Sequence, residues 1–148
     1  MRIEVFTAGS CVPAAGGIGI FGCVEKVDGK VVWTDSGHLG RNGGTLLRAK
    51  FGGAVCGLRK LTEEHRAHPD AALALYLDDR QTTLQLRGLW SVGQNEAHFA
   101  LWREAQDLFF PLDKDRMYFN WIHSNLAAEL VRQTMRRYGL PEQESRRA

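Results

Sequence analysis

The stretch from Ile18 to Thr34, IGIFGCVEKVDGKVVWT, decides the fold of the first third of the chain. Asp28-Gly29 stands between two β-rich runs and is a strong signal for a two-residue hairpin turn. An earlier β-rich run, Arg2 to Ala8, ends at the turn signal Gly9-Ser10. The sequence therefore predicts an antiparallel meander of three strands over residues 2–8, 18–27 and 30–34, followed by a turn at Thr34 to Ser36.

Helical and β-rich segments alternate after this meander. Apolar residues recur at helical spacing from about Thr45 to Arg66, and Ala71 to Leu77 is a continuous apolar run typical of a buried strand. Further helices are expected over residues 78–89, 97–110 and 125–138, the second of them ended by Pro111, with a strand over 116–122. This order predicts an α/β (α+β) fold, in which helices flank a five-stranded mixed sheet.

The composition is that of one ordinary domain, which we place at residues 1–140, with a polar tail at 141–148 that we expect to be disordered. A formal net charge of +2 neither requires nor excludes a nucleic-acid partner. The three cysteines form no CxxC pair, which favours reduced thiols in a cytoplasmic protein. We find no signal peptide and no apolar run long enough to span a membrane.

Four short motifs, in this order, resemble those of the ribonuclease H family. FTAGSC (6–11) resembles the motif of its first strand, where an Asp precedes Gly-Ser, and AKFGGAVCGL (49–58) resembles its first helix, where a Glu stands second. LDD (77–79) resembles the end of its fourth strand, and Asn125 with Glu129 resembles its last helix, where an Asp falls four residues after an Asn. The resemblance covers nearly the whole chain. It implies a ribonuclease H-like sheet with three antiparallel strands and two parallel ones.

The resemblance also implies a site of four carboxylates that hold two Mg²⁺ ions for cleavage of a phosphodiester. Ala8, Lys50, Asp78 and Glu129 fall at these four positions, so two acidic residues are retained and two are lost. An ammonium roughly 4 Å from a metal would repel a divalent ion by several kcal/mol. We therefore expect no cofactor, with Asp78 and Glu129 as ligands only if a metal binds at all. Lys50 is expected either to pair with Asp78 or Glu129, or to extend into solvent.

The leading functional interpretation is a catalytically inactive module that binds an RNA–DNA hybrid or another structured duplex, or that serves as an assembly subunit of a nucleoprotein complex. One alternative is an active, Mg²⁺-dependent ribonuclease H-type endonuclease, in which Glu4 or Asp79 substitutes as a ligand. Another is a module that binds only proteins.

Four residues are candidates for contacts to nucleic acid: Ser10, Cys11, Trp90 and Arg132. Trp90 follows a helix-ending glycine and is the best candidate for an exposed, base-stacking aromatic residue. Trp102 and Trp121 fall in helix and strand patterns and are expected in the core. Arg132 could instead only complement the dipole of its helix.

Overall fold

The computed structural model describes residues 1–12, 17–39 and 45–140. Its elements follow the predicted order, and the tail predicted for residues 141–148 lies outside the described residues. The strands are β1 (Arg2–Val12), β2 (Ile18–Val27), β3 (Lys30–His38), β4 (Ala72–Leu77) and β5 (Tyr118–Trp121). The helices are α1 (Leu46–Ala67), α2 (Arg80–Arg87), α3 (Phe99–Lys114) and α4 (Leu126–Arg137).

The five strands form one mixed sheet in the order β3-β2-β1-β4-β5, which confirms the predicted architecture. β2 pairs antiparallel with β1 and β3, whereas β4 pairs parallel with β1 and β5. The hairpin turn is also confirmed, since Asp28 and Gly29 both have positive φ, of 49° and 85°. This conformation matches the twist of the two strands that the turn joins.

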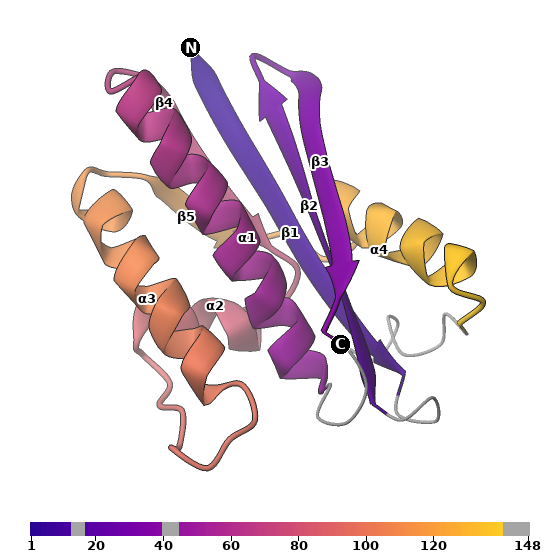
Figure 1. Cartoon of the computed structure of the whole chain (residues 1–148). Helices are drawn as coiled ribbons and strands as arrows, with labels where there is room; N and C mark the ends of the chain where they lie inside the picture. Colours follow the sequence, from indigo (N-terminus) through magenta and orange to yellow (C-terminus); the bar gives the residue numbers. More distant parts are fainter. Residues whose placement is uncertain (13–16, 40–44, 141–148) are drawn as a thin grey trace.

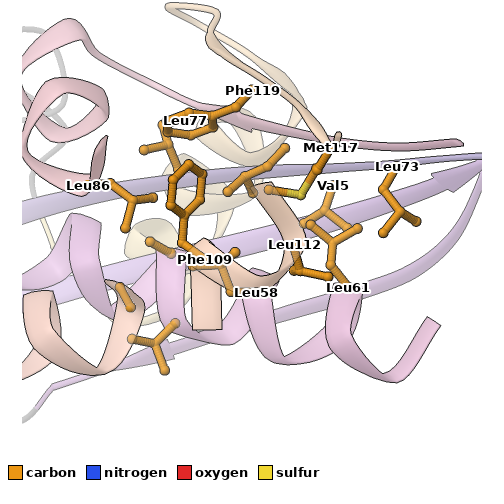
Figure 2. Close-up of a cluster of buried hydrophobic side chains, with 14 of the residues drawn as sticks. Val5, Leu58, Leu61, Leu73, Leu77, Leu86, Phe109, Leu112, Met117 and Phe119 are labelled. Carbon is orange, nitrogen blue, oxygen red and sulfur yellow. The ribbon is translucent and has the colours of Figure 1, made fainter. Parts of the chain in front are cut away.

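Helices cover both faces of the sheet (Figure 1). On one face, apolar residues of β1, β4 and β5 pack against α1 and α3 and form the larger core. Figure 2 shows part of this core, in which Leu58 of α1, Phe109 of α3 and Phe119 of β5 converge. On the other face, α4 packs against β1 and β2 through Ala127, Val131 and Met135. In the described part of the chain, no helix has the length and apolar character needed to cross a membrane.

Four local predictions were wrong. Gly9-Ser10 does not end the first strand, because β1 continues through both residues and pairs with β2 as far as Val12. Thr34 to Ser36 form no turn, because β3 continues through them and pairs with β2 as far as His38. α3 does not end at Pro111 but runs on to Lys114. Pro111 is exposed, so solvent can bond the carbonyl that lacks its usual partner, while Leu112 anchors the last turn in the core. Trp121 is not a core residue, since 39% of it is exposed on the edge strand β5.

Candidate functional site at the ends of β1 and β4

The site begins with a close approach of two backbones. A β-carbon added to Gly9 of β1 would lie 2.5 Å from the backbone nitrogen of Lys50 and 2.6 Å from the carbonyl carbon of Ala49. Only glycine leaves room for this contact. It holds the first turns of α1 against β1 and places Lys50 beside the end of the central strand.

Lys50 is buried, with 1% of the residue exposed, so its side chain does not extend into solvent. Its ammonium lies 3.4 Å from Oδ1 of Asp78 and forms a second, closer ion pair with Oδ2 of Asp79. Asp78 follows the last residue of β4, and Asp79 is the N-cap of α2, where its Oδ1 accepts a hydrogen bond from the Thr82 backbone at 2.8 Å. One buried cation therefore joins α1 to the junction between β4 and α2.

The pKa values of the two carboxyl groups are shifted in opposite directions. Burial raises the pKa of Asp78 to about 6, although the Lys50 ammonium and a hydrogen bond at 3.2 Å from the Gly9 backbone oppose the increase. Burial also raises the pKa of Asp79, but Lys50 and the backbone of Thr82 outweigh it, so the net shift is downward. Both carboxylates are therefore charged partners of Lys50 at neutral pH, and Asp78 is the one that takes up a proton as the pH falls through about 6.

Asn125 connects the third component of the site, α4, to both strands. Its side-chain nitrogen donates to the carbonyl oxygens of Thr7 at 3.2 Å and Leu77 at 3.3 Å. Its side-chain oxygen caps α4 by accepting from the backbones of Ala127 and Ala128. The sequence identifies Asn125 as a motif residue at the start of the last helix. The capping signal was present, but its bonds to β1 and β4 depend on tertiary structure.

A small hollow of about 20 Å³ lies where these elements meet, and Ala8, Asp78, His123 and Arg132 are among its lining residues. This volume accommodates about one water molecule. Nδ1 of His123 lies 3.3 Å from the backbone oxygen of Asp78, which closes this side of the hollow. The structure thus brings together three of the four positions that the family resemblance assigned: Ala8, Lys50 and Asp78.

The fourth position, Glu129, is in the first turn of α4, next to the hollow-lining Ala128. Its carboxylate pairs with Arg132, with Oε2 lying 2.6 Å from one guanidinium nitrogen and 3.1 Å from another. This hydrogen bond to Arg132 lowers the pKa of Glu129. Among the ion pairs of the described residues, Lys50 contacts Asp78 and Asp79 but not Glu129.

The two substitute ligands considered from the sequence have different positions. Glu4 pairs with Arg2 at 3.1 Å and lies four residues from Ala8 along β1, a distance of roughly 13 Å at the usual strand rise. Asp79 is at the site but is bound to Lys50. Within the described ranges, no group of three or more His, Cys, Asp or Glu side chains is arranged to hold a metal ion.

The candidate nucleic-acid contacts differ in accessibility. Ser10 and Cys11 are buried in β1, at 0% and 4% exposure, so their side chains are not available to a ligand in this conformation. Trp90 is 43% exposed, and the Arg80 guanidinium lies 5.6 Å from its ring centroid. Arg132 borders the hollow. The accessible aromatic and cationic candidates are therefore Trp90, with Arg80 beside it, and Arg132.

Solved structures share this arrangement of strands and helices. The N-terminal RNase H domain of Rv2228c from Mycobacterium tuberculosis matches with a TM-score of 0.69 and 18% identity, over 93% of this chain and 96% of that chain. RNase H1 from the archaeon Halobacterium salinarum matches with a TM-score of 0.68 and 18% identity, over 93% and 99%. LC11-RNase H1, isolated from compost by a metagenomic approach and solved with an RNA/DNA hybrid, matches with a TM-score of 0.66 and 17% identity, over 93% and 99%. No family model and no curated protein matches the sequence.

Proposed function

The chain has a ribonuclease H-like fold, and on that premise we propose that it is a non-catalytic module that binds a nucleic-acid duplex, with an RNA–DNA hybrid as its ligand. The observation that carries the proposal is the buried Lys50 ammonium between Asp78 and Asp79. It occupies with a fixed positive charge the region that the family resemblance assigns to divalent metal ions.

These residues do not fit a pair of Mg²⁺ ions. Mg²⁺ requires near-octahedral oxygen ligands, whereas Ala8 has no side-chain ligand atom and Asp79 is already bound to Lys50. At an effective dielectric constant near 20, a divalent ion about 4 Å from an ammonium is repelled by several kcal/mol. The ion pair instead joins α1 to the junction between β4 and α2.

Duplex binding is compatible with loss of the metal ligands, because a protein recognises an A-form-like duplex by shape and by contacts to its phosphates and 2′-hydroxyls. LC11-RNase H1, which has the same fold, was solved with an RNA/DNA hybrid. Arg132, Arg80 and the half-exposed Trp90 supply cationic and aromatic groups around the site.

The test is fluorescence anisotropy with a labelled RNA–DNA hybrid, double-stranded RNA, double-stranded DNA and single-stranded DNA of one sequence, in EDTA and in Mg²⁺. We expect metal-independent binding that favours the hybrid and weakens as salt rises. Arg132→Ala should weaken binding. Arg59→Ala, about two and a half turns along α1 from Lys50, is the matched control.

The same samples are incubated with Mg²⁺ and Mn²⁺ to detect cleavage. We expect intact hybrid. Metal-dependent cleavage that disappears in Asp78→Asn would establish an active nuclease instead. If the protein binds none of these duplexes at low salt, the result would favour the alternative of a module that binds only proteins.

A further inference from the structure

Two of the three cysteines meet in the interface between α1 and β2. Cys23 of β2 is completely buried, and Cys56 of α1 is half-buried. Cys23 donates to the carbonyl oxygen of Gly53, three residues before Cys56 on α1, at 3.2 Å. After burial, the neighbouring Cys56 is the next cause that raises the pKa of Cys23, in agreement with two thiols that lie near each other. The sequence spacing gave no indication of this pair, because the two residues belong to a strand and a helix that are distant in the chain.

Main-chain packing fixes this contact. A β-carbon added to Gly53 would lie 2.9 Å from the carbonyl oxygen of Ala8, and one added to Gly57 would lie 2.7 Å from Cγ2 of Thr7. The helix backbone therefore presses on the sheet on both sides of Cys56, where any larger residue would hold it away. A disulfide requires the β-carbons of its two cysteines to approach closely, and this packing favours such an approach.

One member of the pair is accessible from solvent. Cys56 lines an open cavity of about 580 Å³, together with Asp35, Trp33 and Lys60. Its thiol donates to Oδ2 of Asp35 at 3.3 Å, and Asp35 lies on β3 directly opposite Cys23 in the strand register. Burial raises the pKa of Cys23, which keeps it a thiol. A small reagent therefore meets Cys56 first, with Cys23 behind it.

We propose that Cys23 and Cys56 are a redox pair that closes into an intramolecular disulfide when a hydroperoxide oxidises Cys56. In the first step Cys56 Sγ attacks one oxygen of hydrogen peroxide, the O–O bond breaks, and the other oxygen leaves as water with the thiol proton. Asp35, which accepts the hydrogen bond from Cys56, is placed to relay this proton. Cys56 is then a sulfenic acid.

In the second step Cys23 Sγ attacks Cys56 Sγ, the S–O bond breaks, and the hydroxyl leaves as water with the proton of Cys23. The two thiols together lose two electrons, and the peroxide is reduced to two water molecules. The new bond links β2 to α1 and closes the chain between residues 23 and 56. Such a cross-link constrains the unfolded chain and stabilises the folded one.

The test treats purified, reduced protein with a few equivalents of hydrogen peroxide. Free thiols, titrated after denaturation, should fall from three to one, and peptide mass mapping should identify a Cys23–Cys56 link. The melting temperature should rise by about 5–10 °C, reversibly with dithiothreitol. Cys56→Ser should abolish both changes. Cys11→Ala, which leaves the pair intact, should still form the link.

Several outcomes would overturn the proposal. They are an unchanged thiol count, conversion of Cys56 to sulfinic acid while Cys23 stays reduced, a link that includes Cys11, and a disulfide between two copies of the chain. Mass mapping of the wild-type protein distinguishes all of them, so the decision does not depend on whether a variant folds.

Discussion

The Lys50 ammonium lies 3.4 Å from Oδ1 of Asp78, and both residues are almost entirely buried. An ion pair removed from water contributes little net stability when it is intact, but removal of one partner leaves an uncompensated buried charge. Substitution of one partner should therefore change the free energy of unfolding by more than the intact pair contributes to it.

Lys50→Met should destabilise the fold by about 3 kcal/mol or more at pH 7.5, because Asp78 and Asp79 lose their cation while the volume is preserved. The loss should be smaller at pH 5, where Asp78, whose pKa is already about 6, is protonated. Urea unfolding at the two pH values measures this difference. Lys114→Met, at an exposed lysine of α3, is the control and should change little. If Lys50→Met lowered the free energy of unfolding no more than Lys114→Met, water would be replacing the lost ammonium as the partner of the two carboxylates.

Lys50→Glu should melt at a lower temperature than wild type without metal, because it brings a third carboxylate to Asp78 and Asp79. Combining it with Ala8→Asp should create a site that 10 mM Mg²⁺ stabilises, since a ligand that binds only the native state raises its stability by mass action. Differential scanning calorimetry with and without Mg²⁺ measures the rescue. Wild type should show none. If the double variant also melts identically with and without Mg²⁺, the assignment of these positions to one metal site is wrong.

Asn125→Ala should cost about 2–4 kcal/mol, because it removes both the cap of α4 and the two bonds to the carbonyls of Thr7 and Leu77. Asn125→Ser retains a capping oxygen but cannot bridge the strands, so it should cost about half as much. Chemical unfolding separates the two contributions. A serine variant as unstable as the alanine variant would assign the whole effect to the links between α4 and the sheet.

Glu25 should make the fold less stable as pH rises. It is buried in β2, and burial followed by the neighbouring Glu64 raises its pKa to about 7, from an ordinary value of 4.5. The folded protein therefore holds a proton that the unfolded chain releases between pH 4.5 and 7, and stability falls across that window. Glu25→Gln should flatten the slope and add about 1–3 kcal/mol at pH 8. Unfolding free energies measured from pH 4.5 to 8 test this. Asp70→Asn, at an exposed aspartate before β4, should leave the slope unchanged.

The sheet could be predicted because its signals are local. Asp28-Gly29 specifies a turn with positive φ at both residues, and the continuous apolar run before Asp78 specifies a buried strand. The extent of α3 could not be predicted in this way. Pro111 is a local signal to stop, whereas the burial of Leu112 against a distant part of the chain is what continues the helix.

The principal partner of Lys50 was missed for a similar reason. The sequence predicts Asp78 or Glu129 as the partner of Lys50; Asp78 is one partner, but Asp79 makes the closer ion pair. Asp79 faces Lys50 because its other oxygen caps α2, which fixes the orientation of the carboxylate. An Asp that stands between a strand and the first residue of a helix is a readable N-cap signal. Its orientation toward α1, however, depends on how the helix packs on the sheet.

The contact between Gly9 and the backbone of Lys50 involves no side chain of either residue. The close packing of α1 on β1 at this point therefore does not depend on the charge of the side chains at positions 8 and 50. Side chains at these two positions can therefore be replaced on an unchanged backbone scaffold, so the chemistry of the site can change without a change of fold. A substitution at Gly9 has no such freedom, because its β-carbon would collide with the backbone of α1.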